Sequence, residues 1–400
     1  MLNEKKLQDA YIISGLRTAL GRGKKDGAFS QTHPVELGSI LLKELIRNVN
    51  VNPEYIEDVI VGCATPCGEQ GFNIGRQIAR KAFGDKTPGT QVNRLCGSSA
   101  EAFDIACAKV MSGNYKLILA GGVESMSRVP MGSDMMPFAG DLKNIWKILT
   151  LGPKVVNLTM LEGLEVISMG ISGELIAKKW KLSRKELDEF SYNSHKKAAH
   201  ATSSGYFEKE ILPVKTPNGV VKRDEGIRAN VSIEKMLALK PAFKFDGVIT
   251  AGNSSQITDG AAGILVANED ALKEYGLKPR AKFIASHVIG SDPELQLTGP
   301  IDVVPKVLRK AGFTINDIDL FEVNEAFASV VLATQKELNI PNEKLNVNGG
   351  AIALGHPLGV SGARLLVTLL NELERRNLKR GLSVLCIGGG QSIATIIERV

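Results

Sequence analysis

Residues 92–122 read VNRLCGSSAEAFDIACAKVMSGNYKLILAGG, and this stretch decides the fold. An extended Val92-Asn93 leads into a turn that carries Cys96, and a helix follows the turn. Apolar residues recur in that helix at the spacing of one buried face: Phe103, Ala106, Cys107, Val110 and Met111. Residues 116–120 then read as a buried strand, which ends at the pair Gly121-Gly122.

A second stretch repeats this plan near the end of the chain. Val347-Asn348 leads into a glycine-rich turn with His356, and the strand at 382–387 again ends at a glycine pair. The helix between them repeats the apolar stripe at Ala363, Leu366, Val367 and Leu370. The strands before the two units also match, residues 56–61 resembling residues 318–323. Repeated strand–helix alternation predicts an α/β fold of two duplicated halves with mainly parallel sheets.

The segment between the repeats lacks their regular strand–helix alternation, so we predict that the chain has three parts. Residues 1–121 form an N-terminal α/β half and residues 276–400 a C-terminal α/β half. Residues 122–250 form an inserted loop domain, after which the chain returns to the N-terminal half up to about residue 275. A long insertion between two similar domains often serves as a lid or a binding loop.

Two features stand out inside the insertion. Ser183 and Glu186 form a capping box that predicts the start of a helix. Residues 145–169 are the most apolar part and are broken by glycine and proline. We expect them to form a packed cover or an interaction surface rather than a membrane-surface segment.

Composition narrows the classes of function. Hydrophobic residues make up 44% and charged residues 23%, as in ordinary soluble globular proteins, and 400 residues suffice for two cores. The net charge of +6 comes without a basic run that contains aromatics, which argues against nucleic-acid binding. No run of apolar residues reaches the length of a membrane span.

Localisation is predicted from cysteine usage and from the two ends. Five cysteines, an odd number scattered over a long chain, argue against a disulfide framework and for a reducing compartment. The charged start has no apolar signal region, and Glu398-Arg399-Val400 is not a peroxisomal address. We therefore expect a cytoplasmic protein.

Cys96 and His356 occupy equivalent positions in the two repeats. Backbone N–H groups and the helix dipole after Cys96 predict a lowered thiol pKa, although the residue could equally be a small buried packing cysteine. His356 lies between a glycine and Pro357, so it is presented on a turn rather than within a helix. A neutral imidazole there could take the proton of a nearby thiol.

Two further candidates lie at strand ends. Cys386 ends the last strong strand, and the three glycines after it permit close approach to a ligand. A buried strand cysteine is the alternative. Asn324 lies where a strand gives way to a helix, so it is either a helix N-cap or a holder of a water or substrate oxygen. Strand ends are where α/β proteins build their sites.

Rival motifs find little support. Gly349-Gly350 lacks the spacing and the acidic partner of a dinucleotide fingerprint, and no phosphate-loop motif occurs. Cys63 and Cys67 lack the second pair that a zinc site needs, so no metal site is expected. Cys107 belongs to the helix stripe and is expected in the core.

Six blocks of the sequence together resemble the thiolase family, in its order and spacing and over nearly the whole chain. They are NRLCGSS (93–99), GGVESMS (121–127), TAGNSS (250–255), NEAFA (324–328), GGAIALGHPLG (349–359) and CIGGGQ (386–391). The resemblance implies a five-layered αβαβα fold, a lid-like loop domain and a homodimer or homotetramer. It also implies coenzyme A as a co-substrate and no cofactor.

The resemblance further implies a mechanism. Cys96 attacks the 3-keto group of a 3-oxoacyl-CoA while His356 takes its proton. Cys386 protonates the acetyl-CoA carbanion and later deprotonates incoming coenzyme A. His356, with a water on Asn324, forms one oxyanion hole, and the N–H groups of Cys96 and Gly388 form the other. These are the family's acyltransferase steps in thiolytic cleavage.

The same comparison suggests which residues contact the substrate. It places Ser255 near the pantetheine and Arg228 near the nucleotide, and three residues along the channel: Phe243, Ala251 and Phe327. Ser168 stands before Met169, a residue we assign to the substrate site, where short-chain members usually carry histidine. Gln296 stands near a usual methionine.

These departures, with Glu69-Gln70-Gly71-Phe72-Asn73, favour a 3-ketoacyl-CoA thiolase of fatty-acid β-oxidation. A hydratase–dehydrogenase subunit is then a candidate partner. The alternatives are an acetyl-CoA C-acetyltransferase and a non-catalytic thiolase-like lipid carrier, which would be expected to lose a catalytic residue. A ketoacyl synthase would share the fold, but Cys386 argues against it.

Overall fold

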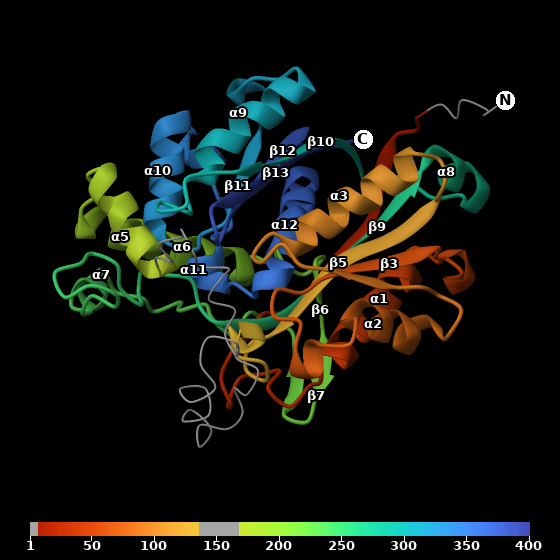
Figure 1. Cartoon of the computed structure of the whole chain (residues 1–400), viewed down its shortest axis with the longest axis horizontal. Helices are drawn as coiled ribbons and strands as arrows, with labels where there is room; N and C mark the ends of the chain where they lie inside the picture. The colour runs from red at the N-terminus through yellow and green to blue at the C-terminus, as the bar shows by residue number, and fades with distance from the viewer. Residues whose placement is uncertain (1–6, 136–167) are drawn as a thin grey trace, which may run out of the picture.

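The computed structural model describes residues 7–135 and 168–400, and its N-terminal and C-terminal halves lie side by side (Figure 1). The N-terminal half holds the strands β1 (Ala10–Thr18), β2 (Gly21–Arg22), β3 (Asp58–Gly62), β4 (Thr90–Val92), β5 (Leu117–Ser125), β6 (Ile211–Leu212) and β9 (Thr258–Asn268). Its helices are α1 (Pro34–Arg47), α2 (Ile74–Phe83), α3 (Ser98–Met111) and α8 (Glu269–Tyr275).

The C-terminal half repeats this plan. Its strands are β10 (Ala281–Gly290), β11 (Leu320–Val323), β12 (Arg380–Ile387) and β13 (Gln391–Arg399), and its helices are α9 (Gly299–Ala311), α10 (Ala328–Leu338), α11 (Ala351–Leu354) and α12 (Ser361–Arg375). The strand order β11-β12-β13-β10 corresponds to β3-β5-β9-β1 in the first half. The duplication predicted from sequence is therefore present in the sheet topology.

One continuous sheet results, because β1 and β10 pair antiparallel through two residue pairs, Tyr11 with Lys282 and Ile12 with Ala281. β3 runs parallel to β4 and β5, and β11 runs parallel to β12. β9 and β13 run antiparallel to both of their neighbours. The prediction of mainly parallel sheets is wrong. β13 follows β12 after only residues 388–390, and so short a connection joins antiparallel strands.

The helices α3 and α12 form the middle layer. Their stripes share one buried cluster, which includes Phe103, Ala106, Cys107, Val110, Ala363, Leu366, Val367 and Leu370. A full burial of one large apolar side chain contributes about 1.5–3 kcal/mol. The two helices approach closely at Gly362, where a Cβ would lie 2.4 Å from the backbone nitrogen of Ala100.

Outer helices complete the layers. The stripe Leu37, Leu41, Leu42 and Leu45 of α1 packs with α2 against the N-terminal strands, and Val303, Val304 and Val307 of α9 pack with Val331 of α10 against β11 and β12. The order helix, sheet, helix, sheet, helix confirms the predicted αβαβα fold (Figure 1).

Two local predictions need correction. Residues Val347-Asn348 form no strand, because the chain turns at Asn346, whose φ is 43°, after a single bridge between Leu345 and Phe321. Cys386 does not lie on the last strand of the chain. The antiparallel β13 follows it, and eight of its residues pair with β12.

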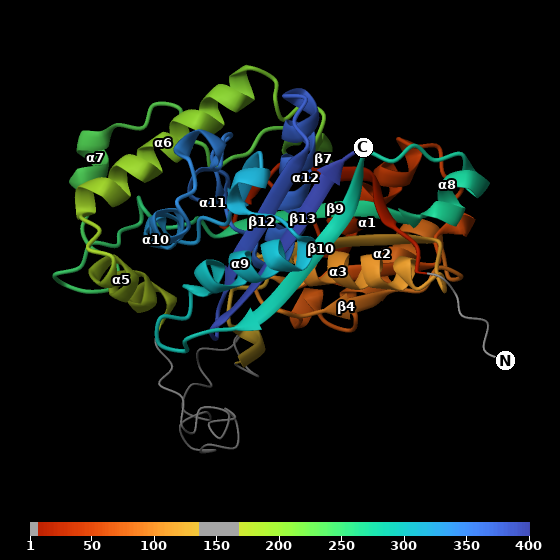
Figure 2. The same cartoon turned by 90° about the horizontal axis from the view of Figure 1, so that it is seen from above.

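The inserted segment holds α5 (Met169–Lys179), α6 (Arg184–Ser203), β7 (Val214–Thr216), β8 (Gly219–Val221) and α7 (Ile233–Leu237). α5, α6 and α7 lie at one end of the molecule in both views, beside α10 and α11 (Figures 1 and 2). The capping box of Ser183 and Glu186 is confirmed at the start of α6. The expected cover at residues 145–169 lies almost entirely outside the described residues. No helix in the described part of the chain is long and apolar enough to cross a membrane.

Candidate active site

Cys96 lies in a tight turn between β4 and α3, as the sequence predicts. The N–H of Gly97 donates to the carbonyl of Arg94 at 2.9 Å, and Leu95 adopts a left-handed backbone with φ 47°. The Cys96 side chain is only 5% exposed and belongs to a small apolar cluster: Ala64, Met126 and Leu358. The turn therefore holds the sulfur in a buried position just before the central helix α3.

The Cys96 thiol is protonated at neutral pH. Burial raises its pKa to about 11, although the backbone N–H groups of Gly388 and of Cys96 itself lower that pKa. The expectation of a lowered thiol pKa is wrong, because the loss of hydration outweighs these two donors. The same two N–H groups lie close enough to the sulfur to stabilise negative charge there.

The loop between α11 and α12 carries His356 and is fixed against β9. The backbone N–H of His356 donates to the carbonyl of Gln256 at 3.0 Å and to Oγ1 of Thr258 at 3.1 Å. Its side chain is buried. The loop of the C-terminal half thus delivers the imidazole against the N-terminal half.

Hydrogen bonds assign the protons of the His356 ring. The hydroxyl of Ser361 donates to the carbonyl of Pro357 at 3.0 Å, so its oxygen accepts from Nδ1 of His356 at 2.6 Å. The ring proton then lies on Nδ1 and the lone pair on Nε2. Nδ2 of Asn324 lies 3.3 Å from Nε2 and donates to it.

The imidazole of His356 is neutral at physiological pH. Burial, with a smaller contribution from the nearby Arg364, lowers its pKa to about 3. A neutral ring with its lone pair on a fixed Nε2 can accept a proton from a thiol.

Asn324 follows β11, and its backbone N–H donates to the carbonyl of Val384 in β12 at 3.0 Å. The alternative of a helix N-cap is wrong, because α10 begins four residues later with Phe327 as its N-cap. The Asn324 side chain instead contacts His356. Its buried Oδ1 has no hydrogen-bond partner among the described residues and can accept from a water or a substrate.

Cys386 lies on β12 with its side chain 1% exposed. Burial raises the pKa of its thiol, and the neighbouring Cys96 raises it further. The backbone N–H of Gly388, two residues after Cys386, lies close to the sulfur of Cys96, so the loops that carry the two cysteines meet. The turns that follow them are also packed together, since a Cβ on Gly97 would lie 2.5 Å from Cδ1 of Ile387.

A buried carboxylate that sequence reasoning did not single out joins the two halves. Oε2 of Glu124 accepts from the N–H groups of Ala64 and Gly359, both at 2.8 Å. Oε1 accepts from the N–H of Thr65 at 3.3 Å and from Nε2 of Gln70 at 2.7 Å. Gly359 belongs to the His356 loop, so Glu124 fixes that loop to the end of β3. A glutamate between glycines and a strand end was the only signal available in the sequence.

Glu325 has the same role on the other side of His356. Its carboxylate accepts from Oγ of Ser194 at 2.7 Å, from Nδ2 of Asn346 at 2.9 Å and from the N–H of Ile352 at 3.1 Å. These bonds connect the Asn324 loop to α6 and α11. Sequence reasoning quoted this glutamate in a motif and gave it no function.

Three of the predicted substrate contacts form an apolar path toward Cys386. Phe243 is 43% exposed, and its ring meets that of buried Phe327 edge to face, with centroids 5.9 Å apart. Phe327, Met169 and Cys386 share one apolar cluster, and a Cβ on Gly388 would lie 3.5 Å from Sδ of Met169. These packed apolar side chains, which we call the apolar path, therefore extend from the surface to the second sulfur.

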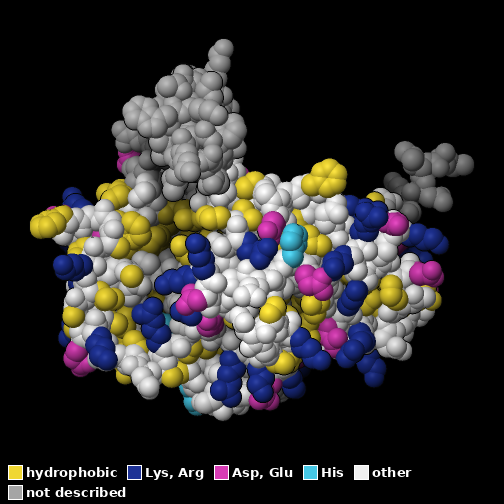
Figure 3. Space-filling view, turned by 90° about the horizontal axis from the view of Figure 1, so that it is seen from below, with side chains coloured by type: hydrophobic (Ala, Val, Ile, Leu, Met, Phe, Trp, Pro, Cys, Tyr) yellow, Lys and Arg dark blue, Asp and Glu magenta, His cyan; other side chains and the backbone are white. Residues whose placement is uncertain are grey.

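The other predicted contacts lie on the loops around this path. The N–H of Ser255 donates to the carbonyl of Ala326 at 2.9 Å, and Ala251 is exposed. Arg228 is exposed, and its backbone N–H donates to Nδ1 of His195 at 3.2 Å. Figure 3 shows a hollow lined by hydrophobic side chains with Lys and Arg side chains beside it, which suits an apolar chain with phosphates at one end.

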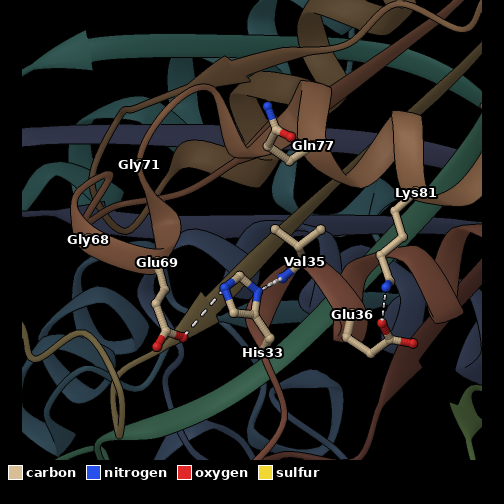
Figure 4. Close-up of a pocket in the computed structure, with 8 residues that line it drawn as sticks. All are labelled: His33, Val35, Glu36, Gly68, Glu69, Gly71, Gln77 and Lys81. Atoms are coloured by element: carbon tan, nitrogen blue, oxygen red, sulfur yellow. Dashed lines mark hydrogen bonds and ion pairs between the residues drawn. The ribbon is translucent and has the colours of Figure 1, made fainter. Parts of the chain in front are cut away.

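A separate surface hollow of about 390 Å³ is shown in Figure 4. Its polar side chains lie against one another, His33 beside Glu69 and Lys81 paired with Glu36. None of the candidate catalytic residues lines it. Residues 7–135 and 168–400 hold no group of three His, Cys, Asp or Glu side chains arranged for a metal ion.

Comparisons with known proteins agree along the whole chain. Residues 10–270 match the family described as thiolase, N-terminal domain, and residues 277–399 match thiolase, C-terminal domain. The steroid 3-ketoacyl-CoA thiolase FadA6 of Mycobacterium tuberculosis is 42% identical over 98% of this chain and 95% of its own. A 3-ketoacyl-CoA thiolase of Bacillus subtilis is 40% identical over 98% of this chain and 100% of its own.

Two further relatives widen the range of named substrates. A 3-oxoadipyl-CoA/3-oxo-5,6-dehydrosuberyl-CoA thiolase of Escherichia coli is 41% identical over 98% of this chain and 100% of its own. The crystal structure of the Bacillus anthracis acetyl-CoA acetyltransferase superposes with a TM-score of 0.88 at 35% identity. That match covers 99% of this chain and 100% of the other.

Proposed function

This chain belongs to the thiolase family and is an acyltransferase that cleaves 3-oxoacyl-CoA with coenzyme A, and from that premise we propose which residues perform the reaction. Cys96 is the nucleophile, His356 its base and Cys386 the second acid and base. One observation carries this assignment. The loops that carry the three residues meet: Leu358, two residues after His356, packs with Cys96, and the N–H of Gly388, two residues after Cys386, lies close to the Cys96 sulfur.

In the first half-reaction the sulfur of Cys96 attacks C3 of the substrate while Nε2 of His356 takes the thiol proton. The tetrahedral centre collapses and the bond between C2 and C3 breaks. Its electron pair passes to the departing acetyl-CoA carbanion, which takes the proton of Cys386 and leaves as acetyl-CoA. The shortened acyl group remains on Cys96 as a thioester.

The pKa values suggest how this attack proceeds. Burial raises the thiol pKa to about 11 and lowers the imidazole pKa to about 3, and both shifts disfavour a thiolate beside an imidazolium. A stable thiolate–imidazolium pair is therefore not the resting state. The proton moves to Nε2 as the bond from sulfur to C3 forms.

In the second half-reaction the thiolate of Cys386 takes the proton of coenzyme A. The coenzyme A sulfur attacks the acyl carbon on Cys96, and collapse of the tetrahedral centre releases the shortened acyl-CoA. The proton on His356 returns to the sulfur of Cys96. Atoms and charges are then restored for another turnover.

Charge on oxygen develops twice, and two sets of donors suit it. The N–H groups of Cys96 and Gly388 act on the oxygen of the acyl group bound to Cys96. The protonated Nε2 of His356, with a water held by Oδ1 of Asn324, acts on the thioester oxygen of the leaving acetyl unit. Removal of one such donor typically lowers the rate by about 10²–10³-fold.

We assign the coenzyme A channel to the path lined by Phe243, Phe327 and Met169. Ser255 and Ala251 lie at its pantetheine section, and Arg228 lies toward the nucleotide. The support is the apolar path to Cys386 and the exposed positions of Ala251 and Arg228. Coenzyme A is a substrate here, with no further cofactor.

The physiological role that we propose is thiolysis in fatty-acid β-oxidation. Ser168, the N-cap of α5, replaces a bulkier histidine, and relatives near 40% identity carry the name 3-ketoacyl-CoA thiolase. An acetyl-CoA C-acetyltransferase is the second candidate, because the acetyl-CoA acetyltransferase of Bacillus anthracis covers the whole fold.

The test is steady-state thiolysis over a series of 3-oxoacyl-CoA substrates from four to sixteen acyl carbons. We expect activity to extend beyond acetoacetyl-CoA. Activity confined to acetoacetyl-CoA would overturn the degradative role and support the acetyltransferase. Cys96→Ser should abolish turnover, and Cys67→Ser, at a partly exposed thiol with no part in the proposed chemistry, should not. Binding of acyl-CoA without thiolysis of any substrate in the series would support the non-catalytic lipid carrier instead.

Three properties accompany this proposal. We propose a homodimer or homotetramer, supported by family membership and tested by light scattering. A cytoplasmic location is supported by five cysteines that are all free. Association with a β-oxidation hydratase–dehydrogenase subunit follows from the proposed role, and co-purification would test it.

A further inference from the structure

Gln296 holds an unusual backbone conformation next to the active site. It lies in the loop between β10 and α9, where its φ is 39° and its exposure is 7%. Left-handed backbone is strained for a residue with a long side chain, and it persists where surrounding contacts enforce it. Such positions gather at functional sites, so the contacts of Gln296 are informative.

The side chain of Gln296 reaches the turn between β12 and β13. Its Oε1 accepts from the N–H of Gly389 at 3.1 Å. A second bond from the same loop joins the N–H of Ser291 to the carbonyl of Gly390 at 2.7 Å. The backbone N–H of Gln296 donates to the carbonyl of Asp292 at 2.8 Å, which closes the loop under the side chain.

The turn that receives these bonds has little stiffness of its own. Gly389 and Gly390 both adopt left-handed backbone, with φ of 75° and 70°, and glycine moves freely between conformations. Gly388 precedes them, so the direction of its N–H depends on how the turn is held. On the opposite side Nη1 of Arg94, two residues before Cys96, donates to Oε1 of Gln391 at 3.0 Å.

We propose that Gln296 is a positioning residue that fixes the glycine turn, through the N–H of Gly389, so that the N–H of Gly388 points at the reacting group on Cys96. The inference rests on the proposed function, because that N–H acts on the acyl oxygen during catalysis. Gln296 itself does not touch the reacting atoms. Arg94 and Gln296 together hold the turn between the Cys96 loop and the loop before α9.

Two substitutions separate this role from packing and from strain. Gln296→Met keeps a long side chain and removes the amide oxygen. Gln296→Gly also removes that oxygen, and it relieves the left-handed strain, which offsets part of the cost of the lost side chain. Glu294→Gln, at an exposed position of the same loop, is the matched control.

The experiment measures kcat, KM, thermal midpoint and the pH profile of Cys96 alkylation by iodoacetamide. Both Gln296 variants should lower kcat about tenfold to hundredfold, with KM within about twofold, because a transition-state donor is misdirected rather than removed. The alkylation midpoint should rise by about half a pH unit or more, since that N–H favours the thiolate. The control should match the wild type.

A kcat within about twofold of wild type in both variants, with an unmoved alkylation midpoint, would overturn the inference. So would a loss in Gln296→Met alone that follows its thermal midpoint, because that pattern indicates packing. If the wild type itself lacked thiolysis, the proposed function would fail, while the alkylation midpoints would still decide whether Gln296 orients the turn.

Discussion

Glu124 provides the sharpest test of how the two halves are joined, and the variant is Glu124→Gln. Oε2 of the carboxylate accepts hydrogen bonds from the N–H groups of Ala64 and Gly359. Oε1 accepts from the N–H of Thr65 and from Nε2 of Gln70. A glutamine keeps one oxygen and places an NH2 group where the other oxygen was. In either orientation the NH2 group faces two donors, and two buried hydrogen bonds are lost.

Each buried donor left without an acceptor destabilises the fold by about 1–3 kcal/mol, so we expect a loss of about 2–6 kcal/mol. The entropy of unfolding scales to about 0.8 kcal/mol per kelvin for 400 residues, which converts this loss to roughly 2–7 °C in thermal midpoint. We also expect kcat/KM to fall at least about tenfold. Gly359 lies three residues after His356, and a displaced base slows the reaction.

The assay is chemical unfolding followed by steady-state thiolysis on the same preparations. Glu374→Gln is the matched control, because that carboxylate pairs with Arg280 at the surface with its side chain 31% exposed. The control should lie within about 1 kcal/mol of the wild type. An unfolding free energy for Glu124→Gln within about 0.5 kcal/mol of the wild type would refute the reasoning, because two unpaired buried donors should lower that free energy by more.

Three further predictions concern the site itself. Gly388→Ala should keep its thermal midpoint, because the new methyl would lie in ordinary contact, 3.5 Å from Sδ of Met169. The same methyl should raise KM for 3-oxoacyl substrates, because it occupies space beside Met169 in the proposed substrate site. Gly359→Ala should fold poorly, because its Cβ would lie 2.7 Å from Oε2 of Glu124. His356→Asn should lower kcat by about 10²–10⁴-fold and flatten the acid loss of stability. His356 has a folded pKa of about 3, below its ordinary 6.5, so the unfolded state binds its proton first. The contribution of His356 to stability therefore falls by about 1.4 kcal/mol per pH unit from pH 6.5 toward 3, and the variant lacks this contribution while both proteins keep that of His195. Cys386→Ser should leave Cys96 open to alkylation and still lower kcat by about 10²–10⁴-fold in thiolysis assays, because proton transfer at C2 is lost.

The architecture was largely readable from the sequence because the repeats carry their own periodicity. The stripes from Phe103 and Ala363 predicted the central helices, and Gly388-Gly389 marked the end of β12. The predicted strand end at Gly121-Gly122 is wrong, because β5 continues through this pair to Ser125. Strand direction was not readable. The turn at 388–390 decides that β13 is antiparallel, and three glycines alone did not reveal a returning strand.

The sequence predicted which residues are candidates and that they lie on turns. It did not predict their pKa values or their hydrogen-bond partners. The pKa of Cys96 depends on burial, which acts against the helix dipole and which no local pattern reports. The bonds of Glu124 and of Gln296 join segments far apart in sequence, so neither could be anticipated from the chain alone. Long-range hydrogen bonds of this kind appear only when the fold brings the segments together.

The most direct test of convergence is mass spectrometry of the enzyme mixed with a 3-oxoacyl-CoA in the absence of coenzyme A, then quenched in acid and digested. We predict one acyl group, shortened by two carbons, on the peptide that contains Cys96 and none on Cys386. The adduct should disappear when coenzyme A is added, and it should form far more slowly in His356→Asn. Acylation of Cys386 instead, or rapid thiolysis by an enzyme that never carries an acyl group on Cys96, would contradict the assignment.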